Sequence, residues 1–132
     1  MRGRPRYAPA VEPRSQARAL GFLRAAIGAA MLVAPAGILR LWAGEDQASA
    51  GARLAIRALA WREIALGAGT VFAVDHDAPV RGWLEAGTLV DASDAVSALA
   101  AFRRLPLLPR VAIPMASGAA VVVGRRLVSQ LS

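Results

Sequence analysis

The sequence predicts an all-α protein: an up-and-down four-helix transmembrane bundle with a basic, poorly ordered N-terminal tail. Three observations support this fold class. Four apolar stretches come close to the roughly 20 residues that a helix needs to cross a bilayer. Short segments that combine charge with Gly, Pro or polar turn residues separate them. No segment keeps the period-two alternation of a half-buried strand, and the alanine-rich runs favour helix.

The composition agrees with a lipid environment. Of 132 residues, 56% are hydrophobic and 19% are charged, and the mean hydropathy is +0.44. A small soluble domain has a large surface to cover with polar side chains, and this chain has few of them. All 16 basic residues are arginine, as in many GC-rich bacterial genomes, and the net charge is +7. No continuous basic face or aromatic platform accompanies that charge, so we expect no nucleic-acid partner.

Residues 1–18 are predicted to form a basic flexible tail and residues 19–132 a membrane domain, because arginines and prolines dominate the tail without apolar periodicity. The first helix is expected over 19–41, with Pro35 tolerated near its end. The alternative is a secretory signal with residues 20–33 as its apolar region and 34–36 as its cleavage site. The long basic segment, the proline within that site and the later apolar stretches favour an uncleaved helix.

The other three helices are expected over 51–74, 81–102 and 111–128. In the helix expected over 51–74, Gly67 and Gly69 would permit close approach of a neighbouring helix. The fourth helix carries Pro114 in its first turn. Because the connections are short, consecutive helices should be antiparallel neighbours. More arginines fall on the side of the two chain ends than on the other side, so both termini are expected in the cytoplasm.

The main candidate site consists of ionisable side chains within the apolar stretches: Arg57, Arg62 and Glu63 in the second helix, Asp91 and Asp94 in the third. Such groups are costly at membrane depth and usually face a bundle interior or a wet cavity. Asp91 and Asp94 lie on one side of their helix and would repel, so at least one is protonated or paired with a cation. Because a guanidinium can hold a carboxylate by two hydrogen bonds, we expect Arg57 or Arg62 to pair with Asp91 or Asp94.

Arg24 and Glu85 are secondary candidates. Arg24 either extends its charge to the membrane interface or joins the same cluster from the first helix. Glu85 follows Arg81 by four residues and is expected near the interface. The chain has no cysteine, and His76 lies in a charged turn without a second cluster of ligands, so we predict no metal site. Because the chain has no nucleotide, zinc or serine-triad motif, we expect no cofactor and favour a protein that is not an enzyme.

One set of motifs resembles a known type of protein. The pattern Arg57-x4-Arg62-Glu63-x3-Gly67, followed by Arg81-Gly82-Trp83 and Asp91-x2-Asp94, is similar to small four-helix integral membrane proteins of actinobacteria. These belong to domain-of-unknown-function families that are distantly DoxX-like. The resemblance covers roughly residues 18–128 and implies a fold and a membrane location, with no catalytic residues. DoxX-like proteins are associated with redox partners and quinone chemistry, whereas this chain has no cysteine and no evident pair of haem ligands.

We therefore expect a small, multi-pass protein of the bacterial cytoplasmic membrane. It would act as a structural or partner subunit, with a membrane protein partner or as a homo-oligomer, and its buried Arg–Asp/Glu network would fix helix pairing. The alternative is a small transporter-like or quinone-associated protein that uses the same cluster as a proton or anionic-ligand site. A third interpretation is a soluble helical protein with the charged positions on an exposed face. The sequence indicates no substrate.

Overall fold

The computed structural model describes residues 12–43 and 49–131, and the regular secondary structure of this part of the chain is all helical, without strands. The predicted all-α class is confirmed for these residues. The elements are α1 (Pro13–Val33), α2 (Pro35–Ala43), α3 (Ala50–Asp75), α4 (Arg81–Ala100), the 3-10 turn η2 (Phe102–Arg104) and α5 (Leu107–Gln130).

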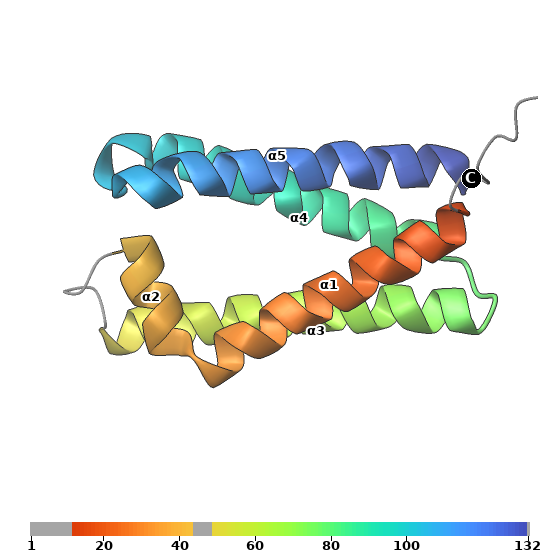
Figure 1. Ribbon diagram of the computed structural model, residues 1–132, viewed down its shortest axis with the longest axis horizontal. Coiled ribbons are helices and arrows are strands. Elements are labelled where there is room, and N and C mark those ends of the chain that lie inside the picture. Colours follow the sequence, from red (N-terminus) through yellow and green to blue (C-terminus); the bar gives the residue numbers. More distant parts are fainter. Residues whose placement is uncertain (1–11, 44–48, 132) are drawn as a thin grey trace, which may run out of the picture.

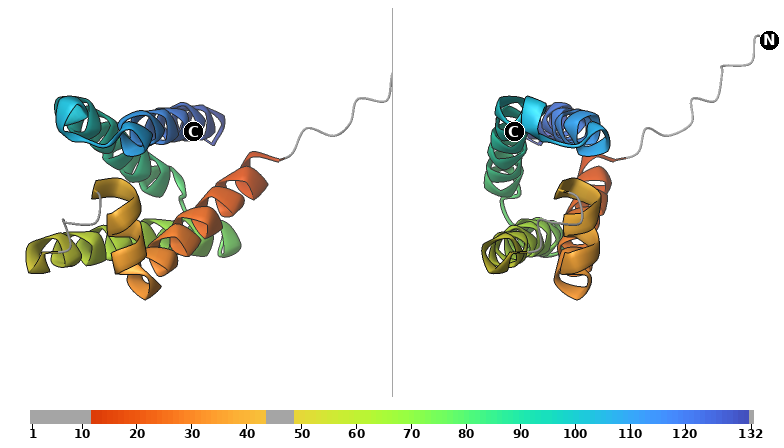
Figure 2. Two further views of the ribbon diagram at one scale, coloured as in Figure 1. Left: turned by 60° about the vertical axis from the view of Figure 1, so that its left-hand side comes forward. Right: turned by 90° about the vertical axis from the view of Figure 1, so that its left-hand side faces the viewer.

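The helices form two antiparallel pairs, α1 with α3 and α4 with α5 (Figure 1). The pairs converge where α1 begins and α5 ends, and they separate toward the end of the molecule where α2 lies (Figure 2). The prediction that all consecutive helices pack as neighbours is therefore only partly correct. Helices α3 and α4 follow one another in sequence but pack against each other far less than either packs within its own pair.

The helix expected over 19–41 is two helices, because the chain breaks at Ala34. This residue leaves the helical region with φ −127° and ψ 53°, and α2 starts at Pro35. Proline has no N–H to donate and disfavours helical geometry at the preceding residue, which explains the break. Leu39 of α2 then packs with Met31, Ile56 and Ala60 in a small core over α1 and α3. Pro35 therefore begins a second helix instead of lying near the end of the first.

The boundary predicted after residue 18 also differs from the structure. Residues 1–11 of the predicted tail lie outside the described residues, but α1 already begins at Pro13. Proline suits the first turn of a helix because its missing N–H would have no helical partner there. Ala17 is fully buried, and Arg18 forms an ion pair with Asp75 at the end of α3, with 2.7 Å between Nε and Oδ1. These contacts extend the helix six residues into the predicted tail.

The last helix is likewise longer than the range 111–128 predicted for it. Helix α5 begins at Leu107 after Pro106, so Pro114 lies inside the helix instead of in its first turn. The side chain of Arg110 donates hydrogen bonds to the carbonyl oxygen of Leu105, the closer at 2.8 Å, which fastens the turn that joins α4 to α5.

Glycines allow α1 and α3 to approach closely. A Cβ at Gly67 would collide with the backbone of α1 at Gly21 and Ala25, and a Cβ at Gly28 would collide with the carbonyl of Ala60. Close contact through small residues is the usual way in which membrane helices pack, because lipid removes the hydrophobic drive between helices. The predicted role of Gly67 is confirmed. Gly69 serves a different partner, the indole ring of Trp83 on α4.

Many apolar side chains remain on the outside of the molecule. Two helices, α1 and α5, are long and apolar enough to span a membrane by length and composition. Helix α5 in particular exposes Leu107, Met115 and Val122, each by about two thirds or more. The sequence predicts that helices α3 and α4 also span the membrane. Among the described residues, they are not apolar enough, or carry too many charged side chains, to do so by the same comparison of length and composition.

Candidate functional site

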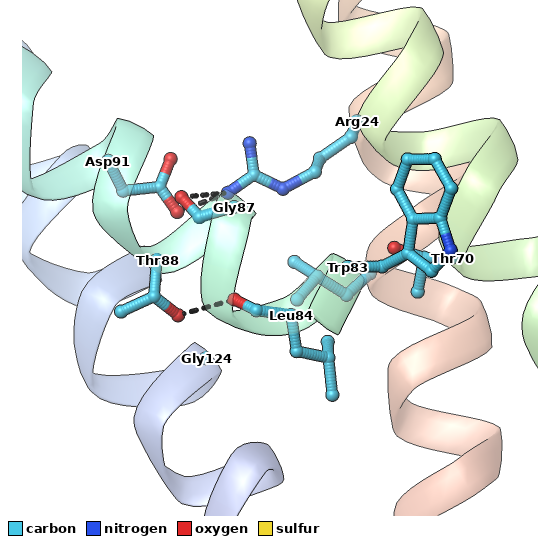
Figure 3. Close-up of a pocket in the computed structure, with 9 residues that line it drawn as sticks. Arg24, Thr70, Trp83, Leu84, Gly87, Thr88, Asp91 and Gly124 are labelled. Carbon is cyan, nitrogen blue, oxygen red and sulfur yellow. Dashed lines mark hydrogen bonds and ion pairs between the residues drawn. The ribbon is translucent and has the colours of Figure 1, made fainter. Parts of the chain in front are cut away.

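The centre of the candidate site is Arg24 of α1, which is only 7% exposed. Its Nη1 donates to Glu63 Oε2 of α3 at 2.7 Å, and its Nη2 donates to Asp91 of α4 and to the carbonyl oxygen of Gly87 at 3.4 Å. Figure 3 shows the guanidinium reaching from α1 toward Asp91 and Gly87. One buried cation thus joins three helices and both helix pairs. Of the two possibilities for Arg24, joining the cluster is the correct one.

A second guanidinium continues the network toward α4. Arg62 holds Asp94 by two hydrogen bonds, from Nη2 to Oδ2 at 2.7 Å and from Nη1 to Oδ1 at 3.2 Å. Its Nη2 also donates to Glu63 Oε1 at 3.2 Å. Glu63 therefore lies between the two arginines and accepts from both. The sequence predicts that an arginine of the helix over 51–74 holds an aspartate of the helix over 81–102 by two hydrogen bonds. This prediction is confirmed for Arg62 and Asp94.

Two predicted members lie apart from this network. Arg57 is exposed on α3 and forms no ion pair with any residue that the structure describes. It lies five residues before Arg62, which places it on a different face of the helix. Glu85 is half exposed and pairs with Arg81 one helical turn earlier, with 2.7 Å between Oε1 and Nε. The grouping of Arg62, Glu63, Asp91 and Asp94 is correct, whereas Arg57 does not belong to it and Arg24 does.

The network forms part of the wall of a large open cavity between the two helix pairs. The cavity has a volume of about 670 Å³, and its walls are otherwise mostly apolar. Leu23 and Ile27 of α1 face it from one pair, and Leu108 and Ile113 of α5 face it from the other. Helix α2 contributes Trp42. This size falls within the usual range for small-molecule sites, about 300–1,000 Å³.

A much smaller cavity of about 10 Å³ lies where α1, α3, α4 and α5 meet. Figure 3 shows its lining, with Arg24, Thr70, Thr88 and Asp91 among the polar residues. Both threonine hydroxyls donate to carbonyl oxygens of their own helices, Thr70 to Leu66 at 2.8 Å and Thr88 to Leu84 at 2.7 Å. The space is about that of one water molecule. It is too small for a substrate.

Sequence reasoning missed the role of Gly87 at this site. A Cβ at this position would lie 3.3 Å from Nη2 of Arg24, so only glycine leaves the guanidinium its full room. The free Gly87 carbonyl then accepts a hydrogen bond from the same nitrogen. The only signal in the sequence is that Gly87 lies one turn before Asp91, on the side of the helix that carries the carboxylate.

The turn around His76 is a helix end. The His76 backbone N–H bonds to the carbonyl oxygen of Phe72 at 3.1 Å, and its ring stacks on that of Phe72. Asp77 takes a positive φ of 51° and pairs with Arg14 at 3.3 Å. Within residues 12–43 and 49–131, no three His, Cys, Asp or Glu side chains are arranged to hold a metal ion.

Comparisons with family models, curated proteins and solved structures find no match to this chain. The resemblance to DoxX-like membrane proteins therefore stays a prediction, and the candidate site rests on its own geometry.

Proposed function

We propose that this chain is a multi-pass protein of the bacterial cytoplasmic membrane that acts as a structural or partner subunit. In this proposal the Arg24 network fixes the two helix pairs relative to each other. The single observation that carries the proposal is Arg24, which is buried and bonded at once to Glu63 in one pair and to Asp91 in the other.

The exposed apolar side chains support a membrane location. Monomeric soluble proteins rarely expose large contiguous apolar patches, and such patches mark contact with a membrane or a partner. The outward face of α5 is apolar along much of its length, and α1 has 21 residues, about 31 Å of helix, against about 30 Å of hydrocarbon. A cleaved leader would remove Arg24 and the glycines that pack α1 on α3, so the packing supports retention of α1.

The charge pairing supports a structural role for the network. Each of its three carboxylates accepts at least one hydrogen bond from a guanidinium. Removing Arg24 would leave Glu63 and Asp91 without the cation that they share, and breaking a buried ion pair in this way typically costs about 3–5 kcal/mol. Such a penalty strongly disfavours any arrangement in which the two helix pairs slide past each other.

The alternative function, a proton or ligand site of a transporter-like protein, is favoured by the cavity. The network lies on the wall of a cavity large enough for a small molecule. Its three carboxylates and two guanidiniums sum to a charge of −1 when all are ionised. This balance favours a proton or a cation over the anionic ligand that the sequence also allowed.

Substitution of the buried carboxylates tests the structural role. Glu63→Gln and Asp91→Asn keep shape but remove charge, and both should lower the thermal midpoint of the purified protein in detergent by several degrees or more. Glu85→Gln is the matched control, because this carboxylate is exposed and paired only within its own helix. Equal midpoints for Asp91→Asn and Glu85→Gln would contradict the proposal.

A further inference from the structure

The large cavity has a polar end and apolar walls. Arg24, Glu63 and Asp91 are each 7% exposed and lie on its wall, together with the partly exposed Arg62 and Asp94. The rest of the wall comes from both helix pairs and from α2 and is largely apolar. A ligand that fits must therefore have an apolar body and one polar end.

The polar end holds more carboxylates than guanidiniums. The charged residues on the wall are Arg24 from α1, Arg62 and Glu63 from α3, and Asp91 and Asp94 from α4. Helices α2 and α5 contribute no charged residue to it. With two guanidiniums and three carboxylates, one negative charge is left over when all five groups are ionised, and an uncompensated charge away from water is costly.

Two carboxylates can receive a ligand. Only one oxygen of Asp91, Oδ2, is bonded to Arg24, and the other accepts no hydrogen bond from the described residues. Figure 3 shows that second oxygen pointing away from the guanidinium. The Asp94 side chain is 33% exposed on the same helix, one turn further along. The surplus charge is therefore within reach of a molecule in the cavity.

We propose that this cavity binds a lipophilic monovalent cation, with its apolar or aromatic body between the helix pairs and its charge beside Asp91 and Asp94. The proposal deepens the alternative function above and rests on the proposed membrane location. It assigns the ligand class by charge complementarity: a cation neutralises the network, whereas an anion of the same shape adds to its imbalance.

The test uses two ions of nearly the same shape and opposite charge, tetraphenylphosphonium and tetraphenylborate. The full chain is placed in phosphatidylcholine nanodiscs, and binding of each labelled ion is measured by equilibrium dialysis against empty nanodiscs. We expect saturable, protein-dependent binding of the phosphonium and none of the borate. Saturable borate binding of equal strength, or no saturable phosphonium binding, would overturn the proposal.

Charge variants locate the site. Asp94→Asn brings the network to zero charge at a partly exposed position and should weaken phosphonium binding by about tenfold or more. Glu85→Gln, a carboxylate of the same helix that does not line the cavity, should leave it unchanged. Equal loss in both variants would show that the overall charge of the protein, and not the cavity, attracts the ion.

A second pair of variants tests the walls without touching the network. Ala116 lines the cavity and Ala119 does not, although both are exposed on α5. Ala116→Phe should abolish phosphonium binding, and Ala119→Phe should not. If Ala116→Phe instead converts a stable dimer to a monomer, the cavity is an interface between copies and the proposal is wrong. Far-UV circular dichroism of each variant shows whether the helical fold is kept, so that a loss of phosphonium binding is distinguished from a loss of fold.

Discussion

At the scale of single residues, the site depends on which arginine is buried. Arg57, Arg62 and Arg24 look alike in the sequence, each on an apolar helix, yet only Arg24 is almost fully enclosed. The presence of a charged cluster and the pairing of Arg62 with Asp94 could be predicted from helical spacing. The central position of Arg24 could not, because it depends on α1 packing against α3 and facing α4, which no local pattern encodes.

The ion pair between Arg18 and Asp75, the last residue of α3, yields a residue-level prediction. The hydrogen bond from Arg18, with the attraction of its charge, holds the pKa of Asp75 below its ordinary value. Because the folded pKa is lowered, the stabilisation is present above the unfolded pKa of about 4 and is lost as the pH falls through the folded value. In Arg18→Gln the pKa of Asp75 should rise, as followed by carboxyl ¹³C NMR. An unchanged titration, as expected in the control Arg126→Gln, would contradict the pairing.

At the scale of elements, the two tight pairs, α1 with α3 and α4 with α5, join consecutive long helices, as the short connections predict, whereas α3 and α4 pack against each other much less. The contact of α1 with α3 could be predicted, because the connection between them is short and the glycines of α3 permit a close neighbour. The sequence predicts one helix over 19–41 with Pro35 tolerated near its end, whereas the structure breaks the chain at Ala34. The lack of a backbone N–H at Pro35, combined with the packing of Leu39 on α1 and α3, turns the chain instead.

Substitution of Gly67 tests the pairing of α1 with α3. In Gly67→Ala the added Cβ meets backbone atoms of α1, which cannot move aside as a side chain could. We expect a loss of about 1–3 kcal/mol in the free energy of unfolding, measured by SDS titration in mixed micelles. Gly118→Ala is the control in α5, where a Cβ meets nothing within 4 Å and should stabilise the helix by up to about 1 kcal/mol. Equal effects of the two substitutions would refute the close contact.

At the scale of the whole molecule, the two pairs form a wedge that is closed at one end and open at the other (Figure 1). The apolar core of the closed end consists of Ala17, Ala73, Val80, Leu84 and Leu127. The all-α class and the approximate positions of the long helices could be predicted from hydropathy and breakers. The wedge and its cavity could not, because they depend on the angle between the pairs.

The absence of cysteine from the sequence makes the proposed topology directly testable. The turn between α3 and α4 lies at the same end of the molecule as the end of α5, and η2 lies at the opposite end (Figure 1). We expect an impermeant maleimide to label Arg104→Cys in intact cells, and Asp77→Cys and Gln130→Cys only after lysis. Labelling of all three, or of none, before lysis would exclude this orientation.

The central claim is that Arg24 couples the two helix pairs through Asp91, and a double-mutant cycle tests it most directly. The free energy of unfolding in micelles is measured for Arg24→Gln, Asp91→Asn and the double variant, with Arg81→Gln and Glu85→Gln as an exposed reference cycle. The account predicts a coupling of about 1–3 kcal/mol for the buried pair and a few tenths for the reference. Additive effects of Arg24→Gln and Asp91→Asn would contradict it.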